Sequence, residues 1–296
     1  MAESDPSWDL YRTFLAVAQE RSLSGAARTL GLAQPTVGRH IDALEDAVGF
    51  QLFTRSQHGL APTEAAEELR PYAESLSATA AALLRVASAQ GDTVRGVVRM
   101  TASEIVGAEI VPPILAGLRE QYPHLVIELV LSNTMEDLLR RDADIAVRMV
   151  KPTQGALVAK HLGPIDVGLH AHRRYLARHG TPAALEDLGR HALIGFDRES
   201  APIRSMMKRV GGLQRQNFTL RANSDLAQLA AIRAGYGIGF CQVRLAEREG
   251  LVRVLPETVL TLDTWLAMHE DLRTSRRCRI VFDALAAGLA RYIRGG

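Results

Sequence analysis

The stretch AARTLGLAQPTVGRHIDALE, residues 26–45, carries polar side chains whose types and spacing suit DNA recognition. In the major groove, glutamine binds adenine and arginine binds guanine through two hydrogen bonds each, and Gln34 and Arg39 supply both residue types. Thr36 adds a hydroxyl for a phosphate oxygen or a methyl group for thymine. This pattern predicts a surface that contacts the backbone and the bases of double-stranded DNA.

A helix must present these side chains, and the apolar residues behind them fit one. Counting about 100° per residue from Val37, three later apolar side chains fall within about 40° of it. They are Ile41, Leu44 and Val48. The polar residues lie on the far side, and Pro35 suits a first helical turn, where its missing N–H would have no partner. The stripe predicts that one face packs and the other stays uncovered.

A second short helix, GAARTL, precedes this one. We expect Ser24 to cap its N-terminus, Gly31 to end it in the left-handed conformation and Leu32 to fill the turn with an apolar side chain. The arrangement is a helix-turn-helix whose second helix has the recognition geometry. Because such motifs are short, a helix-turn-helix in an unrelated all-α module is an alternative at this point.

The charge balance argues against a nucleic-acid partner. The whole chain has a net charge of +2, and residues 1–62 hold five arginines against seven carboxylates, a net charge of −2. DNA-binding domains usually have a basic surface. The interpretation therefore depends on position: Arg39 and His40 lie in the N-terminal half of the second helix. The acidic residues Asp42, Glu45 and Asp46 lie on later turns, where we expect them to point away from phosphate.

The wider segment WDLYRTFLAVAQERSLSGAARTLGLAQPTVGRHIDALEDAVGFQLFTR, followed by HGLAPTEAAEEL, resembles the N-terminal region of LysR-type transcriptional regulators. The resemblance comprises an opening helix with Leu10, Phe14 and Val17, the helix-turn-helix, a segment leading into a β-wing, and a linker helix that starts at Thr63. It implies an α/β multidomain fold: a winged helix-turn-helix, a long linker helix, and a two-subdomain α/β effector domain resembling type 2 periplasmic binding proteins.

The domain ranges that follow are 1–62 for DNA binding, 63–90 for the linker and dimerisation helix, and 91–296 for the effector domain. Subdomain I comprises 91–162 plus 269–296, and subdomain II comprises 163–268. The DNA-binding residues implied are Ser24, Gln34, Pro35, Thr36, Gly38, Arg39 and His40 in the helix-turn-helix, with Arg55 and His58 in the wing.

Two of these positions depart from the family pattern. Gly38 stands where the family commonly has serine, which removes a hydroxyl and weakens the helix by about 1 kcal/mol. His58 stands where the family often has arginine, which weakens phosphate binding in the wing or makes it depend on pH. Both departures lead us to expect DNA affinity to depend on oligomerisation.

The linker sequence supports self-association. Apolar or small residues recur at spacings of three and four, the pattern of a coiled-coil seam. They are Leu69, Tyr72, Leu76, Ala80 or Thr79, Leu83 and Ala87. An intramolecular packing stripe is the alternative, and Pro71 is expected to kink the helix. A homodimer implies a pseudo-palindromic operator, and the resemblance implies a homotetramer of two dimers.

From residue 94 onward, apolar strands such as LVIELVL (125–131) alternate with helices such as the one expected at 134–141. This alternation predicts parallel sheets covered on both faces, which place ligand sites at the carboxyl ends of their strands. The candidate residues at strand ends are Thr101, Ser103, Ser132, Asn133, Arg148, Phe196 and Asn223.

These side chains predict a small organic anion as the effector, because helix N-termini near Ser103 and Ser132 suit a carboxylate and Arg148 suits its charge. Each hydroxyl has the alternative role of a helix cap. Arg148 has the alternative of a structural ion pair with Asp144 or Glu104, and Phe196 either stacks on an aromatic effector or fills the wall of the cleft.

Other functional classes find little support. The sequence has no HExxH, P-loop or nucleophile elbow, and GYGIGF (235–240) lacks the dinucleotide spacing. A metal site at His170 and His172, with His161 and His179 nearby, has no assigned third ligand. We expect neither an enzyme nor a cofactor. A solute-binding protein is the better rival, but that function leaves residues 8–90 without a role.

No apolar run is long enough for a transmembrane helix, and no secretory signal begins the chain. Cys241 and Cys278 make no disulfide framework, and Cys241 is expected to be an inert buried thiol. The sequence thus predicts a cytoplasmic, DNA-binding regulator with a small-molecule effector and no membrane partner.

Overall fold

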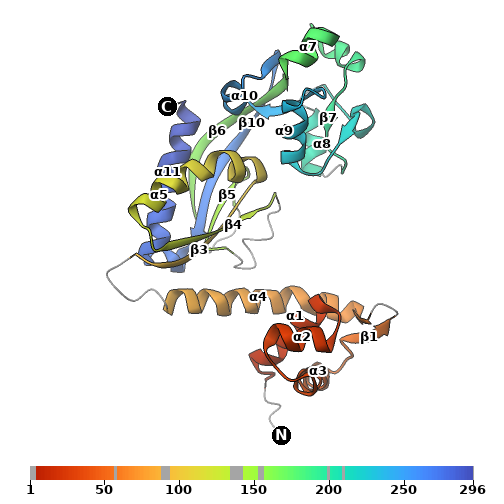
Figure 1. Ribbon diagram of the computed structural model, residues 1–296, viewed down its shortest axis with the longest axis vertical. Helices are drawn as coiled ribbons and strands as arrows, with labels where there is room; N and C mark the ends of the chain where they lie inside the picture. The colour runs from red at the N-terminus through yellow and green to blue at the C-terminus, as the bar shows by residue number, and fades with distance from the viewer. Residues whose placement is uncertain are drawn as a thin grey trace. The chain divides into compact units, whose positions relative to one another are not determined.

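The computed structural model describes residues 5–56, 59–87, 94–133, 143–152, 157–198, 201–208 and 211–295 (Figure 1). The predicted helix at 134–141 and the wing residue His58 lie outside them. Contacts divide the chain into an N-terminal unit that extends to Ser88 and a C-terminal unit that contains most of the remainder.

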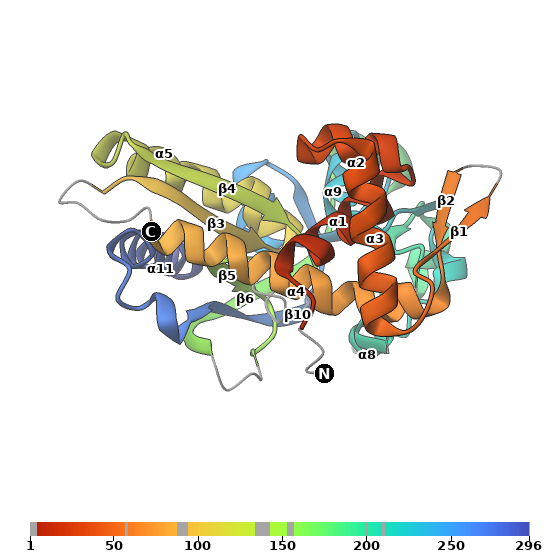
Figure 2. The ribbon, with the colours of Figure 1, turned by 90° about the horizontal axis from the view of Figure 1, so that it is seen from below.

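The N-terminal unit consists of three short helices, a hairpin and a long helix (Figure 2). They are α1 (Trp8–Glu20), α2 (Leu23–Leu30), α3 (Gln34–Val48), β1 (Phe53–Ser56), β2 (Gly59–Pro62) and α4 (Glu64–Ala87). The strands β1 and β2 pair antiparallel. The core beneath them is apolar and includes Phe14, Val17, Val37, Leu44 and Leu52, all fully buried.

The apolar stripe predicted for α3 is confirmed, since Val37, Ile41 and Leu44 are buried. Gly31 ends α2 with φ +67°, also as predicted. The predicted cap of α2 was wrong: Ser22 caps the helix by accepting a hydrogen bond from the Gly25 N–H at 3.3 Å, and Ser24 lies inside the first turn.

Leu32 also differs from its prediction, because 40% of it is exposed and it does not fill the turn. Leu32 is not among the residues that pack in the core of this unit, and its N–H donates to the Ala27 carbonyl at 3.0 Å, so its backbone closes the end of α2 while its side chain stays outside the core.

The helix α4 runs from Glu64 to Ala87 and continues past Pro71. Its first turn is capped by Thr63, whose hydroxyl accepts a hydrogen bond from the Ala66 N–H at 3.2 Å. The half-buried Leu69 packs against the core of the N-terminal unit.

The C-terminal unit is built on a six-stranded sheet in the order β4-β3-β5-β10-β6-β9. The strands are β3 (Gly96–Ala102), β4 (Leu125–Leu131), β5 (Ile145–Arg148), β6 (Leu157–Ala171), β9 (Ile238–Gln242) and β10 (Val252–His269). The mixed α/β architecture is the predicted one. The expectation of parallel sheets was wrong for this sheet, in which β3 pairs parallel with β4 and β5 but β10 pairs antiparallel with β5 and β6, and β6 pairs antiparallel with β9.

The reason lies in β6 and β10, which are 15 and 18 residues long and pair antiparallel with each other along most of their length. Apolar strand segments such as PIDVGLHA and TLDTWLAMH reveal burial but not the direction of the neighbouring strand. Both are parts of these two long strands, which pass through two lobes (Figure 1).

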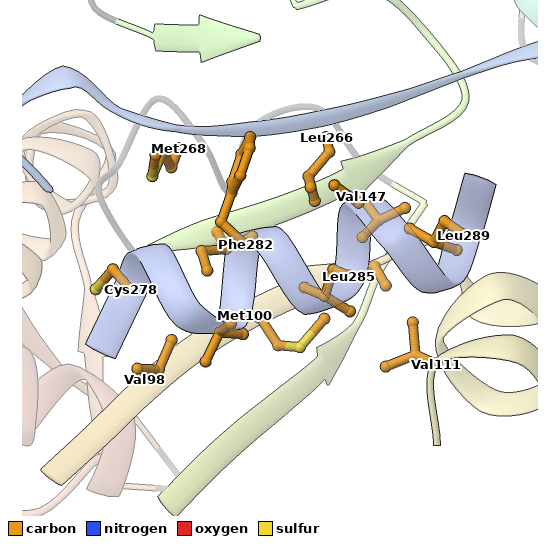
Figure 3. Packing of buried hydrophobic residues seen from close by; sticks show 14 of the residues in the cluster. Val98, Met100, Val111, Val147, Leu266, Met268, Cys278, Phe282, Leu285 and Leu289 are labelled. Atoms are coloured by element: carbon orange, nitrogen blue, oxygen red, sulfur yellow. The ribbon is translucent and has the colours of Figure 1, made fainter. Parts of the chain in front are cut away.

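Lobe I surrounds the core in which Val98, Met100, Val147, Leu266 and Phe282 pack (Figure 3). Its other elements are η1 (Val106–Ile110), α5 (Val111–Gln121), η4 (Glu270–Leu272) and α11 (Arg276–Arg294). Lobe II contains two apolar clusters, one with Leu169 and Phe218 and one with Leu229, Ile232 and Leu245. Its elements are α7 (Arg173–His179), η2 (Leu185–Arg190), β7 (Ile194–Gly195), α8 (Ala201–Lys208), η3 (Arg215–Asn217), β8 (Leu220–Arg221), α9 (Asp225–Arg233) and α10 (Val243–Arg248).

Both long strands contribute residues to the core of lobe I and to a core of lobe II, and the points at which they cross between the lobes lie close together. On β6 the change falls between Leu162 and Val167, where Gly163 has φ +125°. On β10 it falls between Leu260 and Leu266, next to a register shift at Thr264. The predicted end of subdomain II is position 268. Leu266 and Met268 pack in the core of lobe I, so β10 crosses between the lobes a few residues before that position.

Candidate functional site

The N-terminal end of α3 presents the predicted recognition residues to solvent. Gln34, Pro35 and Arg39 are exposed and Thr36 is half-buried. The Arg39 guanidinium donates a hydrogen bond to the Thr36 hydroxyl at 3.3 Å, so the two side chains lie on the same face. Gly38 is on this helix too, and a Cβ there would meet no atom within 4 Å.

His40 and Ser24 point elsewhere. The His40 ring nitrogen Nδ1 lies 2.9 Å from the hydroxyl of Thr13, a buried residue of α1 that itself donates to the Asp9 carbonyl. His40 therefore connects α3 to α1. The hydroxyl of the half-buried Ser24 lies 2.9 Å from that of Ser22.

The hairpin carries Arg55, which is exposed on β1 opposite Leu60. The end of α1 holds the hairpin in place, because the Leu60 N–H donates to the Arg21 carbonyl at 2.8 Å. Gly59 has φ +103°, and a Cβ there would lie 2.5 Å from the same carbonyl oxygen. Both the conformation and the close approach require glycine at this position.

The predicted effector residues of lobe I meet at the carboxyl ends of three parallel strands. Ala102 of β3 pairs with Leu131 of β4 and Val147 of β5, so Ser103, Ser132 and Arg148 follow side by side. The Ser103 N–H donates to the Val147 carbonyl at 3.3 Å. The Ser132 N–H donates to the Ala102 carbonyl at 2.9 Å.

Within this group, Arg148 is 97% buried and donates through Nη2 to the hydroxyl of Thr101 at 2.8 Å. Its Nη1 donates to the Val147 carbonyl at 3.2 Å. The hydroxyl of Ser103 is buried and has no hydrogen-bond partner among the described residues. Lobe I thus offers a buried guanidinium and a buried hydroxyl at one edge of the sheet.

A second set of contacts joins this edge to the N-terminus of α9 in lobe II. Asn133 accepts from the Glu104 N–H at 3.1 Å and donates to the Asp225 carboxylate at 3.0 Å. The Glu104 carboxylate accepts from the Ser224 hydroxyl at 2.8 Å and from the Leu226 N–H at 3.3 Å. Burial, together with the Glu104 charge, raises the pKa of Asp225 above its usual value, although the Asn133 hydrogen bond opposes this.

Glu104 and Asp225 were missing from the predicted site. Glu104 had been considered only as an ion partner of Arg148, and its carboxylate instead reaches the first turn of α9. A capping signal was present in the sequence, since Ser224 precedes a helix and serves as its N-cap. Nothing in the sequence indicated that an acid 120 residues earlier would bind the same serine.

The predicted residues of lobe II lie at the ends of the two parallel strands β7 and β8. Phe196 packs against the core of lobe II, and Asn223 accepts a hydrogen bond from the Arg198 N–H at 2.9 Å. These residues are connected to the lobe I group through Ser224 and Asp225, which follow Asn223 directly.

The C-terminal end of α9 forms another contact between the lobes. Arg233 lies 2.9 Å from the Glu109 carboxylate of lobe I, and Arg248 of α10 lies 2.7 Å from it. Hydrogen bonding and charge from Arg233, followed by the charge of Arg248, lower the pKa of Glu109 in spite of its burial. The lobes are therefore joined at both ends of α9.

The histidines considered as metal ligands have other contacts. His170 is buried and bonds the Gly168 carbonyl, His172 caps α7, and His161 lies 2.8 Å from Asp263. Among the described residues, no group of three potential metal ligands occurs. Burial raises the pKa of the Cys241 thiol to about 12, which agrees with an inert side chain. In the same residues, no helix has the length and apolarity to cross a bilayer.

Two family profiles match the chain. One, described as bacterial regulatory helix-turn-helix protein, lysR family, matches residues 8–67. The other, described as LysR substrate binding domain, matches residues 91–290. The two matches together include the exposed face of α3 and the strand ends of the C-terminal unit.

Individual proteins are similar over nearly their whole length. The probable HTH-type transcriptional regulator LtrA of Klebsiella pneumoniae is 27% identical over 284 residues, which cover 92% of either protein. The HTH-type transcriptional regulator PtxR of Pseudomonas aeruginosa is 30% identical, over 94% of this chain and 91% of PtxR. The solved structure of CrgA, a LysR-type transcriptional regulator from Neisseria meningitidis, matches with a TM-score of 0.59 at 25% identity, over 95% of this chain and 98% of CrgA.

Proposed function

Because the chain belongs to the LysR family of bacterial transcriptional regulators, we propose that it reads a specific DNA sequence and that a small organic anion modulates its activity. The observation that carries the first part is the face of α3, where Gln34, Thr36 and Arg39 lie opposite a buried apolar stripe. A surface of this kind suits the major groove. The protein works in the cytoplasm, where its DNA is, and without a catalytic step.

Fluorescence anisotropy with DNA fragments from around the protein's own gene tests this function. We expect one fragment to bind far more tightly than a scrambled duplex and to weaken as salt rises. Arg39→Ala is expected to reduce the specific affinity by about 5- to 150-fold, the range for one lost base contact. Arg12→Ala, which removes an exposed arginine from α1, is the control for charge.

If no fragment is distinguished from the scrambled duplex even at low salt, the function is wrong. The acidic balance of residues 1–62 would then be the better guide. The chain would act as a ligand-binding module whose helix-turn-helix serves assembly.

The self-association that we propose uses α4. Three large side chains, Tyr72, Leu76 and Leu83, are 72%, 47% and 67% exposed on this helix. Their spacing is that of a seam, and pairing of two copies would cover them. Such a dimer presents two recognition helices to successive half-sites of a pseudo-palindromic operator, and two dimers form a tetramer.

The effector site that we propose lies at the strand ends of lobe I, with the anion near Ser103, Ser132 and Arg148. The support is the buried Ser103 hydroxyl without a partner among the described residues, close to a buried guanidinium. Thr101 orients that guanidinium. We include Asn133, Phe196 and Asn223 in the proposed site because they follow the ends of β4, β7 and β8.

A thermal-shift screen with small carboxylates tests the effector. At least one acid is expected to raise the melting temperature, and Ser103→Ala is expected to reduce that increase. Ser275→Ala is the matched control, because its hydroxyl is also buried without a partner among the described residues but lies at the start of α11. A ligand whose shift is the same in Ser103→Ala, Ser132→Ala and the wild type would place the site elsewhere.

A further inference from the structure

The segment Gln51 to Phe53, which leads from the recognition helix into the first strand of the wing, is bound from one side by α3. The Glu45 carboxylate oxygen Oε1 accepts hydrogen bonds from the Leu52 N–H at 2.7 Å and from the Phe53 N–H at 3.4 Å. Glu45 is half-buried, one turn before the end of the helix. A charged acceptor makes stronger hydrogen bonds than a neutral one, so this contact fixes the segment firmly to α3.

The same segment is bound by Thr63, the residue directly before the linker helix α4. The Thr63 hydroxyl donates to the Gln51 carbonyl at 2.8 Å, and the Thr63 N–H donates to the Leu52 carbonyl at 3.0 Å. The hydroxyl also accepts from the Ala66 N–H in the first turn of α4. Thr63 therefore holds the segment and caps the helix at once.

Packing leaves the segment little freedom to adjust. Leu52 is fully buried and Phe53 is 9% exposed, with its ring 5.7 Å from that of Phe14 in α1. Buried backbone groups need partners, and Glu45 supplies one to the N–H groups of Leu52 and Phe53. The Gln51 carbonyl that Thr63 binds is exposed, so the Thr63 hydroxyl fixes the position of the segment against α4 instead of satisfying a buried group. Loss of either side-chain partner would remove one of the contacts that hold α3 and α4 to the segment.

From this arrangement we propose that Glu45 and Thr63 are positioning residues that couple the direction of the recognition helix to that of the linker helix. The inference rests on the proposed function for its consequence on DNA. In a dimer paired through α4, this coupling determines the distance and rotation between two recognition helices. Glu45 thereby has a structural function, although its negative charge by itself disfavours DNA binding.

Four variants separate the hydrogen bonds from other effects. Glu45→Ala and Thr63→Val remove the side-chain partners, whereas Glu45→Gln and Thr63→Ser retain an acceptor or a hydroxyl in place. Asp46→Ala is the charge control, because it removes an exposed carboxylate from the same helix. Thermal unfolding shows which variants fold. If Glu45→Ala does not fold, the proposed coupling is tested with Thr63→Val alone.

The first readout is binding to a duplex that the wild-type protein selects from random DNA, and to derivatives with one to four base pairs inserted between the half-sites. The wild type, Glu45→Gln, Thr63→Ser and Asp46→Ala are expected to lose about tenfold or more in affinity on insertion. Glu45→Ala and Thr63→Val are expected to lose most of this dependence while binding a single half-site as the wild type does.

The second readout needs no DNA. Spin labels at Asp42→Cys in α3 and Glu68→Cys in α4, both exposed, report the distance between the helices within one chain diluted in unlabelled protein. Both native cysteines are buried. We expect one narrow distance in the wild type and a broad distribution in Glu45→Ala and Thr63→Val.

The two experiments distinguish failure of the proposed DNA-binding function from failure of the proposed coupling. If the wild type selects no DNA, the proposed function fails, and the distance distribution still decides the coupling. A narrow distance together with unchanged spacing dependence in both Glu45→Ala and Thr63→Val would overturn the inference.

Discussion

Gly38 of the recognition helix has open space at the position where a side chain would begin. A Cβ there would meet nothing within 4 Å, and glycine inside a helix is less favourable than alanine by about 1 kcal/mol. Gly38→Ala is expected to stabilise the protein by about 0.5–1 kcal/mol. Gly38→Ser is expected to stabilise less but to increase DNA affinity, because its hydroxyl is available to phosphate.

Urea unfolding and anisotropy on the selected fragment measure the two effects of the Gly38 variants. A loss of DNA affinity in Gly38→Ser with normal stability would show that the glycine itself approaches the DNA backbone, and the assignment of a missing phosphate contact would be withdrawn.

His170 makes the stability of the C-terminal unit sensitive to acid. Burial, opposed by a hydrogen bond to the Gly168 carbonyl and assisted by the Arg253 charge, lowers the pKa of His170 from 6.5 to about 4. A buried neutral histidine binds no proton until the pH approaches its folded pKa, whereas the unfolded chain binds one below about 6.5. Stability is therefore lost as the pH falls from 6.5 toward 4.

His170→Asn retains a donor for the Gly168 carbonyl and removes the titration. Between pH 7 and pH 5 the wild type is expected to lose about 2 kcal/mol more unfolding free energy than the variant, at about 1.4 kcal/mol per pH unit below 6.5. Urea unfolding at both pH values measures this difference. Equal losses in the two proteins would contradict a neutral, buried His170.

The helix α4 carries large apolar side chains that are exposed in the single chain and that pairing with a second copy would cover. Leu76→Glu and Leu83→Glu are each expected to shift the protein toward monomer, since a carboxylate at a seam is desolvated without a counter-charge. Sedimentation velocity measures the assembly. Val150→Glu, which alters an equally exposed apolar residue outside α4, is expected to leave it unchanged.

The opposite result for α4 is equally specific. If both variants remain as associated as the wild type, the stripe packs within the chain, which is the alternative that its periodicity leaves open.

Helices were the elements that the sequence predicted best. The spacing of Val37, Ile41 and Leu44 reflects a local period, and their burial follows from it. The cap of α2 was misplaced by two residues because serines at 22 and 24 are both able to cap, and only the backbone conformation at Ser22 decides between them. The pairing of β6 with β10 was missed, because strand direction is set by segments about 90 residues apart.

In the C-terminal unit, lobe I contacts both ends of α9 of lobe II, and the contact at the N-terminal end includes the titratable residue Asp225. Burial and the Glu104 charge raise the pKa of Asp225 in the folded state. For an acid with a raised folded pKa, stability is fully present below the unfolded pKa and is lost as the pH rises through the folded one. The ionised carboxylate therefore opposes the folded state at neutral pH.

Asp225→Asn is expected to raise the melting temperature at pH 7, and the difference from wild type is expected to vanish near pH 3.9, the approximate unfolded pKa of aspartate. The amide oxygen still accepts from Asn133. Differential scanning calorimetry across this range measures the effect, and Asp283→Asn, an exposed aspartate of α11, is the control. A lower melting temperature at pH 7 would show that the helix dipole outweighs burial at this site.

The sequence alone determined the helix-turn-helix, its exposed face, the mixed α/β class and the family, because these depend on local periodicity and short motifs. Tertiary structure alone decided which polar groups meet: Glu45 with the wing segment, Glu104 with α9, and Arg148 with Thr101. These partners are 7 to 122 residues apart. A side chain's residue type states what it can bind, and only the folded chain brings a particular partner within hydrogen-bond distance.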